Sequence, residues 1–394
     1  MSISEFKHYA LCSCVATAML AGCGVLPPSL SGTASQSRGP ESAFASVGRG
    51  YTLLSTFNIK DGVGPHGLTA LDGLLYGTTS GGGRNSAGTF FSLTTSGERH
   101  TLRYFSAKNG AVSPLSVLTR LNGLLYGWTS TLCNTPSSNC GEMFSLNRSG
   151  RERIIHVFRE VQQSPTSLTV LNNVLFGTTA NGKDSGDGTV FSLTPSGDFH
   201  VLYRFKGALT PSKDGAWPNS IIALNGMLYG TTLYGGKNGN GTVFSVTTTG
   251  KEHVIYSFGS AYSGDGALPN GVTTLHGKFY GTTFFGGNYY GCFGDPPVGC
   301  GTVFSVTTDG KEEVLHSFQE SDGDPATGLA ALNGKLYGTT SDTLFSITTA
   351  GKEKTLLSLY GCGCSALTPL KGTLYGTTVG GGKYYSGTAY AFTP

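Results

Sequence analysis

Charged side chains are scarce in this sequence: lysine, arginine, aspartate and glutamate together make up 12% of its 394 residues. The net charge of +3 is too small for the basic surface of a nucleic-acid-binding protein, so we expect no nucleic-acid partner. The low charge comes with 11% aromatic residues, a combination that argues against intrinsic disorder. The composition is therefore that of a folded protein.

Signatures of several familiar classes are also absent. The 61 glycines follow no Gly-X-Y period, which excludes collagen, and no Trp-Asp pair recurs as it does in WD repeats. The chain contains no His-Glu-x-x-His, Gly-x-Ser-x-Gly or Gly-Lys-Ser/Thr motif, so no motif indicates a zinc protease, a serine hydrolase or a P-loop protein. Carboxylates are abundant, and an acid–base pair for glycoside chemistry stays open.

The N-terminus has the pattern of an export signal followed by a tether. Lys7 precedes an apolar stretch over residues 9–21, which is shorter than the roughly 20 residues of a membrane-spanning helix. The ending Leu-Ala-Gly-Cys resembles the bacterial lipobox, and this resemblance implies cleavage before a lipidated Cys23; an ordinary signal peptide is the alternative. By analogy with enteric lipoproteins, Gly24 favours the outer membrane. We expect a signal peptide over 1–22, a lipid-anchored flexible tether over 23–48 and one domain over 49–394.

One unit recurs seven times along the rest of the chain, and its clearest copy is Leu-Asn-Gly-Met-Leu-Tyr-Gly-Thr-Thr at residues 224–232. Each copy contains an aromatic residue followed by glycine, and the aromatic residues are Tyr76, Tyr126, Phe176, Tyr229, Tyr280, Tyr337 and Tyr375. A second element, typified by residues 241–250, follows every copy, and a third, typified by residues 251–258, follows six of the seven. A period of about 50 residues indicates a propeller or an array.

Each unit is predicted to form four short β-strands, A to D, because β-branched and aromatic residues dominate its segments. In the clearest copy these strands are 219–224, 227–233, 242–248 and 252–258, and Asn-Gly at 225–226 favours a tight hairpin. The last unit lacks strand D, while a spare copy, residues 51–57, precedes the first unit. Pairing it beside residues 389–393 would close a ring and remove both free edges. The sequence thus predicts an all-β, closed seven-bladed β-propeller of four-stranded blades.

The ordered recurrence of Leu-Tyr-Gly-Thr-Thr, Gly-Gly, Gly-Thr-Val-Phe and Gly-Lys-Glu resembles the GloVer tandem-repeat family, the "choice-of-anchor" proteins of bacteria. The resemblance covers about residues 51–394 and implies an exported, anchored repeat protein. It brings no catalytic residues to this chain. The sixth unit departs most from the pattern, because its loop between strands B and C is reduced to Ser341-Asp342.

Loop length favours one face of the predicted ring as the functional one. Loops A–B and C–D are short, uniform turns, whereas loops B–C and D–A, which share the other face, are long and variable. Their aromatic rings could stack on sugars or clamp peptides. The candidate ligand-binding residues are Trp217, Tyr234, Phe284, Phe285, Tyr289, Tyr290, Phe293, Tyr384 and Tyr385. The alternative is that these rings pack the glycine-rich loops together.

The D–A loops repeat an Asp-Gly pair, and the aspartates are Asp61, Asp214, Asp265 and Asp322. One interpretation is a polar ring near the channel mouth that binds Ca²⁺ or a cationic group. The other is that each aspartate stabilises its own turn. No Asp-x-Asp-x-Asp-Gly loop is present, so the sequence predicts no cofactor and no metal, with Ca²⁺ at the polar ring as the alternative.

Six cysteines follow Cys23 and fall into three close pairs: Cys133 and Cys140, Cys292 and Cys300, and Cys362 and Cys364. The first two pairs each lie within one long B–C loop, which predicts local disulfides and an oxidising compartment. The third is a Cys-x-Cys pair, where we expect a strained disulfide, with a redox or metal role as the alternative.

These features predict a lipid-anchored protein of the cell envelope, at the outer membrane or the cell surface, that binds a glycan or a protein through its loop face without catalysis. Two alternatives stay open: a propeller enzyme acting on polysaccharide as a lyase or hydrolase, and a scaffold subunit of an outer-membrane assembly. We expect a monomer whose only membrane contact is the lipid anchor.

Overall fold

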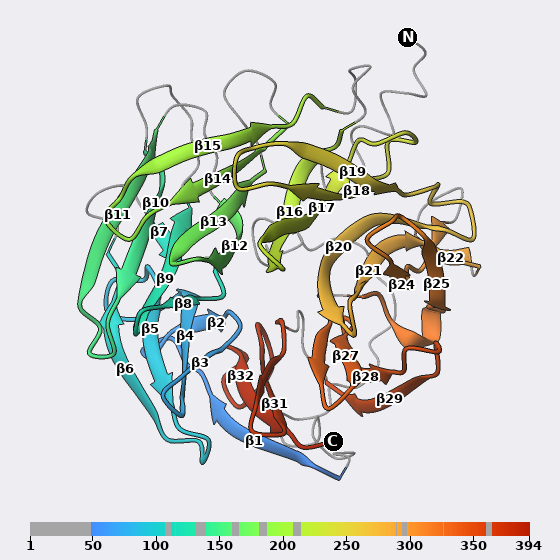
Figure 1. Ribbon diagram of the computed structural model, residues 1–394. Coiled ribbons are helices and arrows are strands. Elements are labelled where there is room, and N and C mark those ends of the chain that lie inside the picture. Colours follow the sequence, from blue (N-terminus) through green and yellow to red (C-terminus); the bar gives the residue numbers. More distant parts are fainter. Residues whose placement is uncertain are drawn as a thin grey trace, which may run out of the picture.

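The computed structural model describes residues 49–106, 112–114, 116–130, 139–159, 165–180, 187–207, 214–288, 290–293, 298–325, 327–359 and 365–394. The expected signal peptide and tether lie outside these residues, as do Cys23, Cys133, Tyr289, Cys362 and Cys364. The described chain is all-β and forms a ring of seven sheets, the blades, around a central axis (Figure 1). Among the residues described, no helix is long and apolar enough to cross a membrane.

Each blade has strands A to D in antiparallel order from the centre of the ring outward. Strand A of blades one to seven is formed by β2 (Val63–Pro65) with β3 (Thr69–Leu71), β7 (Val112–Pro114) with β8 (Thr119–Leu121), β12 (Pro165–Leu171), β16 (Ala216–Leu224), β20 (Gly266–Leu275), β26 (Ala330–Leu332) and β30 (Thr368–Leu370). Strand B is β4 (Leu74–Gly81), β9 (Leu124–Ser130), β13 (Val174–Thr179), β17 (Met227–Tyr234), β21 (Lys278–Gly286), β27 (Lys335–Thr339) and β31 (Thr373–Thr378).

The outer half of each blade consists of strands C and D. Strand C is β5 (Thr89–Leu93), β10 (Asn139–Leu146), β14 (Thr189–Leu193), β18 (Thr242–Val246), β24 (Thr302–Val306), β28 (Thr343–Ile347) and β32 (Thr388–Phe392). Strand D is β6 (Arg99–Tyr104), β11 (Glu152–Arg159), β15 (Phe199–Arg204), β19 (Glu252–Ser257), β25 (Glu312–Ser317), β29 (Glu353–Ser358) and β1 (Tyr51–Thr56). A short hairpin of β22 (Tyr290–Phe293) and β23 (Val298–Gly299) and a 3₁₀ turn, η3 (Glu320–Asp322), complete the described elements.

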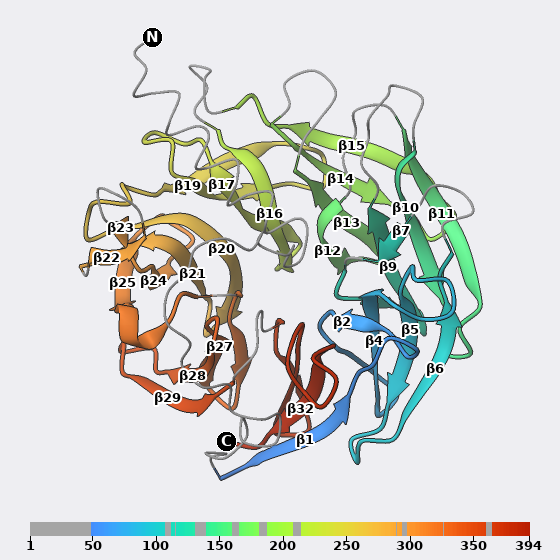
Figure 2. The same ribbon diagram turned by 180° about the vertical axis from the view of Figure 1, so that it is seen from behind.

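The ring closes by pairing the first strand with the last. β1 runs antiparallel to β32, with Tyr51 opposite Phe392 and Thr56 opposite Thr388. The C-terminus accordingly lies beside β1 in the view of Figure 1 and in the opposite view of Figure 2. The predicted seven-bladed propeller and its closure are confirmed. The pairing gives blade seven the fourth strand that the other blades have, and it joins the first strand of the chain to the last.

The backbone geometry explains why two positions of the repeat are glycine. Gly226 has φ +78° in the A–B turn and follows Asn225 at φ +50°, the left-handed pair that a two-residue hairpin requires. Gly230 faces Phe244 across β17 and β18, and a Cβ added to it would lie 2.6 Å from the Phe244 ring and 2.2 Å from the Ser220 carbonyl oxygen. The aromatic ring of strand C therefore covers a bare backbone position on strand B.

The two threonines of Gly-Thr-Thr join strands and blades. The second one bonds within the blade, as Thr232 does with the Thr242 hydroxyl at 2.8 Å. The first one donates to a backbone carbonyl of the next blade in three cases: Thr78 to Ser116 at 3.3 Å, Thr282 to Thr327 at 3.0 Å and Thr377 to Pro65 at 3.1 Å. Hydroxyls buried between blades thus find partners, as burial requires.

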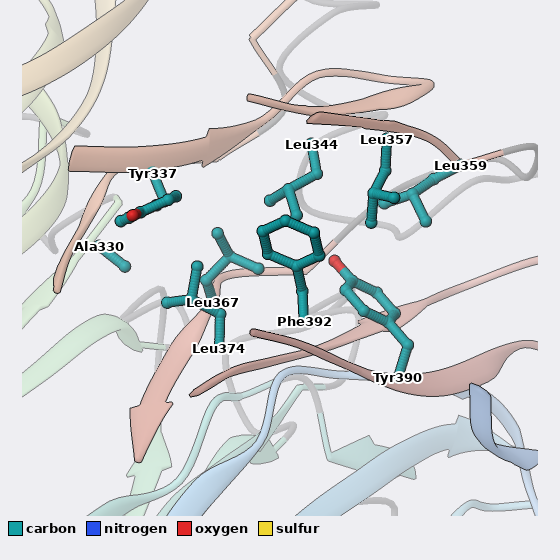
Figure 3. Packing of buried hydrophobic residues seen from close by; sticks show 9 residues of the cluster. All are labelled: Ala330, Tyr337, Leu344, Leu357, Leu359, Leu367, Leu374, Tyr390 and Phe392. Carbon is teal, nitrogen blue, oxygen red and sulfur yellow. The ribbon is translucent and has the colours of Figure 1, made fainter. Parts of the chain in front are cut away.

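The hydrophobic core is divided among the interfaces between blades, which we call seams. At the seam of blades six and seven, Tyr337 and Leu344 from one blade meet Leu374, Tyr390 and Phe392 from the other (Figure 3). Leu344, Leu374 and Tyr390 are fully buried there. Each seam is a small core of its own, so the rigidity of the ring depends on all of them together.

Candidate functional site

The long loops share one face because they bond to each other. The Gly83 amide in the B–C loop of blade one donates to the Ile59 carbonyl in the D–A loop before it, at 2.9 Å. Blade five repeats the arrangement, with the Gly287 amide donating to the Asp265 carbonyl at 3.0 Å. In these two blades the B–C loop and the D–A loop before it therefore lie side by side at the ends of the strands.

Four of the candidate aromatic residues lie together on blades four and five. Trp217, Tyr234, Phe284 and Phe285 are half-buried and pack against a small apolar base of Leu233, Ala267 and Leu268. We call these seven residues the aromatic cluster. Trp217 meets Tyr234 edge-on, with ring centroids 5.6 Å apart and an angle of 83° between the rings. The cluster combines an immobile base with rings that keep part of their surface in water, which suits stacking on a flat ligand.

The backbone under Trp217 is in an unusual conformation. Trp217 has φ +58° although a proline follows it, and Leu268 has φ +56° before Pro269. Side chains disfavour this left-handed region, and a following proline restricts the residue further. Each amide is held by the preceding blade: Trp217 donates to the Asp187 carbonyl at 2.8 Å and Leu268 to the Asn240 carbonyl at 2.9 Å. Strained residues gather at functional sites, so these two point to the aromatic cluster.

Blade one shows what the strain costs. The corresponding position is Gly64, at φ +63°, and its amide donates to the Ser386 carbonyl at 3.0 Å. Glycine adopts this conformation freely, whereas Trp217 and Leu268 require about 1 kcal/mol or more. Trp217 also belongs to strand β16, and not to the preceding loop where the sequence placed it. Its ring is thus carried by a strand end, which is more rigid than a loop.

The two aspartates next to this cluster are bonded within their own loops. Asp214 accepts the Tyr203 hydroxyl at 2.5 Å and the Lys206 amide at 3.1 Å. Asp265 accepts the Tyr256 hydroxyl at 2.9 Å. It also accepts the amides of Gly259 and Gly266, each at 2.6 Å. Both carboxylates therefore brace the segments that lead to Trp217 and Leu268.

The other two aspartates of the expected polar ring also have local partners. Asp61 forms an ion pair with Arg99 at 2.8 Å and accepts the Asn58 side-chain amide at 2.5 Å. Asp322 lies 3.8 Å from His316 and accepts the Gln319 amide at 3.0 Å. The Asn58 and Gln319 contacts lie within the turn of each aspartate, as the turn-stabilising interpretation expects, whereas the Arg99 ion pair ties Asp61 to strand β6. Within the described part of the chain, no group of three His, Cys, Asp or Glu side chains could hold a metal ion.

Tyr384 and Tyr385 lie in the B–C loop of blade seven and do not join the aromatic cluster. Their exposed fractions are 49% and 69%, and Lys383 lies 5.4 Å from the Tyr384 ring centre. Tyr385 also has a left-handed backbone, at φ +54°. The structure thus divides the predicted aromatic surface into two parts: the cluster of blades four and five, and a tyrosine pair on blade seven.

The remaining candidate residues are described only in part by the structure. Tyr289 and the side chains of Tyr290 and Phe293 are outside the described residues. β22 pairs with β23, with Tyr290 opposite Gly299; Cys292 lies on β22 and Cys300 directly follows β23. The side chains of the other five cysteines, Cys133, Cys140, Cys292, Cys362 and Cys364, lie outside the described residues, and the three pairings stay predictions.

Sequence reasoning missed Leu268 and the two tyrosines that bond to Asp214 and Asp265. The signal for Leu268 was the proline after it, which repeats Trp217-Pro218 at the same position of the next blade. Tyr203 and Tyr256 occupy equal positions on strands β15 and β19, two residues before the strand D phenylalanine. Nothing local marks either tyrosine as a partner of an aspartate in the loop that follows.

Comparison with known proteins identifies the repeat and the fold. The family model described as the Gloeobacter/Verrucomicrobia repeat matches the chain twice, over residues 24–224 and 210–390. A search of the curated proteins finds no match. The chain is similar in structure to the extracellular domain of a proposed one-component system from B. thetaiotaomicron, at 10% identity and a TM-score of 0.56. That similarity covers 86% of this chain and 40% of the other.

A second solved structure with a similar fold is an oligogalacturonate lyase in complex with manganese. The identity is 8% and the TM-score 0.51, over 82% of this chain and 86% of the lyase. At such identities both similarities concern the architecture alone.

Proposed function

The chain belongs to the Gloeobacter/Verrucomicrobia repeat family, and we propose that it is a non-catalytic binding module of the cell envelope that takes a carbohydrate on the aromatic cluster. The observation that carries this proposal is Trp217, a half-buried ring held in a strained backbone conformation on the loop face. Unlike Leu268, which has the same strained backbone but is buried, Trp217 keeps part of its ring exposed, and this exposure supports a ligand contact.

The chemistry around the cluster favours a sugar ligand over a peptide. Trp217, Tyr234, Phe284 and Phe285 offer ring faces to the C–H surface of a pyranose. The nearby carboxylates Asp214 and Asp265 are engaged by their own loops, so they offer little charge to a peptide. A protein ligand is the other outcome of the experiment below. We expect the binding unit to be a monomer.

The proposed setting is the outside of the cytoplasmic membrane, through a lipid on Cys23 and a tether over residues 23–48. Three features support it: the lipobox-like sequence, the paired cysteines, and the structural likeness to an extracellular domain. Labelled palmitate should enter the wild-type protein, and a Cys23→Ala variant should leave the membrane fraction. A Cys23→Ala protein that stays membrane-bound would contradict lipid anchoring.

A glycan array tests the binding proposal. The full chain with Cys23→Ala, which takes no lipid, is applied to the array, and each hit is measured by calorimetry. We expect Trp217→Ala to weaken binding about tenfold or more, since loss of a central ring costs about 1.4 kcal/mol or more. The matched control is Tyr385→Ala, which removes a tyrosine that is 69% exposed and lies outside the cluster, and it should leave the affinity unchanged.

Two results would reject the carbohydrate proposal. One is an array without a hit while a protein partner binds through Trp217. The other is a Trp217→Ala variant that binds glycans as the wild type does. The second candidate function, a polysaccharide lyase, is favoured by the likeness to the oligogalacturonate lyase. It predicts unsaturated products from pectic oligomers, whereas a binding module returns the oligomer unchanged.

A further inference from the structure

Two side-chain clusters of the same design lie where the outer strands of blades three, four and five meet. In each, the tyrosine two positions before the strand D phenylalanine reaches the aspartate of the following D–A loop and the first glutamate of the next blade's strand D. The two triads are Tyr203–Asp214–Glu252 and Tyr256–Asp265–Glu312. The same arrangement therefore occurs at two consecutive seams.

Hydrogen-bond valence assigns the proton in the first triad. A phenol carries one hydrogen, and the 2.5 Å contact places that of Tyr203 on Asp214. Glu252 faces the same hydroxyl, where only a lone pair is left. Asp214 already accepts the Lys206 amide, whereas Oε1 of Glu252 is buried with no hydrogen-bond partner among the described residues. Glu252 is therefore the carboxyl of the triad that takes up a proton.

The second triad repeats this logic. Asp265 accepts Tyr256 and two backbone amides, and Oε1 of Glu312 is buried without a partner in the described structure. Burial, helped by the aspartate of the same triad, raises the pKa of Glu252 to about 7 and that of Glu312 to about 7. Both glutamates therefore titrate close to neutral pH.

In each triad, two residues of chain separate the aspartate from a residue of the aromatic cluster. Asp214 precedes Trp217, and Asp265 precedes Leu268, with Gly-Ala between them in both cases. The strained residues at the ends of these segments need support from the surrounding structure to keep their conformation. The aspartates provide it, because each is bonded both to a tyrosine on the strand and to backbone amides of the loop.

We propose that the two Tyr–Asp–Glu triads are positioning elements of the aromatic cluster and make its geometry, and hence ligand binding, dependent on pH. At acidic pH each glutamate is neutral, and the bonds from tyrosine to aspartate hold the cluster. Near neutral pH each glutamate loses its proton, and the new charge repels the aspartate of its triad. The effect on binding rests on the proposed function, whereas the effect on Trp217 does not.

The other charged groups around the triads are few. Lys206 faces Glu252 and opposes its rise in pKa, while Glu313 adds to that of Glu312. Asp187 faces Asp214 from the B–C loop of blade three, and burial together with Asp214 raises its pKa. Because the Asp187 carbonyl also accepts the Trp217 amide, Asp187 is the competing source of a pH effect at Trp217.

The chain contains two tryptophans, which makes the test direct. The full chain with Cys23→Ala is labelled with 5-fluorotryptophan, and its two fluorine resonances, assigned with Trp217→Phe, are followed from about pH 5 to about pH 9. We expect the Trp217 resonance to shift with a midpoint near pH 7, and the resonance of Trp128, which is 7% exposed in another seam, to stay constant.

Substitutions identify the titrating group. Glu252→Gln keeps the size of the side chain but cannot ionise, so it should abolish most of the Trp217 shift, and adding Glu312→Gln should abolish the rest. Glu152→Gln is the matched control, because Glu152 begins strand D of blade two and pairs with Arg103 instead of a tyrosine. It should leave the Trp217 shift unchanged.

The outcomes separate the two proposals. The inference is overturned if Trp217 does not titrate, or if its shift survives Glu252→Gln and Glu312→Gln and disappears in Asp187→Asn. It is supported if the glutamine variants flatten the shift, whether or not a glycan is ever found. With a glycan in hand, the wild type should bind at least about threefold more weakly at pH 8.5 than at pH 5.5, and the double variant equally at both.

Discussion

Blades two and four place a glutamate at the same position, the first residue of strand D, and surround it with different chemistry. Glu152 meets the guanidinium of Arg103 from blade one, with which it forms a short ion pair. Glu252 meets Tyr203 and Asp214 from blade three and its loop. Arginine neutralises a glutamate that stays charged, whereas a tyrosine already bonded to an aspartate accommodates one that keeps its proton. One repeat position thus serves as an ion pair in one seam and as a proton-holding site in another.

Removing Arg103 breaks its ion pair with Glu152 and should have the largest effect on the free energy of unfolding. Arg103→Leu leaves the Glu152 carboxylate, 15% exposed, without its cation, and we expect a loss of about 2–4 kcal/mol in the free energy of unfolding at pH 8. The loss should shrink toward pH 5, since burial raises the pKa of Glu152 and allows it to take up a proton. Urea denaturation of the variant at both pH values measures this difference, with Arg103→Lys as the milder control. A loss below about 0.5 kcal/mol at pH 8 would show that the ion pair does not stabilise the seam.

Replacing Glu252 and Glu312, the corresponding glutamates of blades four and five, by glutamine should stabilise the protein at alkaline pH. Glu252 and Glu312 have folded-state pKa values of about 7 against 4.5 for an ordinary glutamate. A raised pKa means that the stability these groups contribute at acidic pH is lost between about pH 4.5 and about pH 7. Glutamine cannot ionise and avoids this loss.

For the double variant Glu252→Gln, Glu312→Gln we expect a gain of about 2 kcal/mol at pH 8, and about half of it from each substitution. The figure is well below the full linkage value because both side chains are partly solvated. The same denaturation experiment at pH 4.5 should show almost no gain. A double variant less stable than the wild type at pH 8 would mean that the glutamates are ionised and bonded in the folded state.

Removing a tyrosine hydroxyl from a triad should have the smallest effect on the free energy of unfolding. Tyr256→Phe takes one donor from Asp265, which keeps the amides of Gly259 and Gly266 at 2.6 Å, so we expect a loss of about 0.5–1 kcal/mol. Thermal unfolding followed by circular dichroism is sufficient to measure it. The variant should also raise the apparent pKa of Glu312, since the hydrogen bond with Tyr256 lowers it. An unchanged titration would show that Tyr256 does not bond to Glu312.

The architecture was predictable because its determinants are local and repeated. Asn225-Gly226 encodes a hairpin in two residues, and the spare strand at residues 51–57 indicates how the ring closes. The site was predictable only in part. The aromatic rings of blades four and five were found, but Trp217 lies at a strand end, and Tyr384 and Tyr385 proved separate from the cluster.

The side-chain contacts at the seams could not be predicted from the sequence, because each seam joins residues about one repeat apart. Arg103 and Glu152 are separated by 49 positions, and their pairing depends on the twist that brings neighbouring D strands together. Leu268 was missed because its left-handed backbone goes with a hydrogen bond that its amide donates to the preceding blade.

The sequence by itself determined the number of blades, their strand order and the closure of the ring, since turns and strand patterns act over a few residues. Only the tertiary structure decided which rings share a surface and which glutamates keep a proton. Those properties depend on burial and on partners supplied by the next blade, and neither is written into a single repeat.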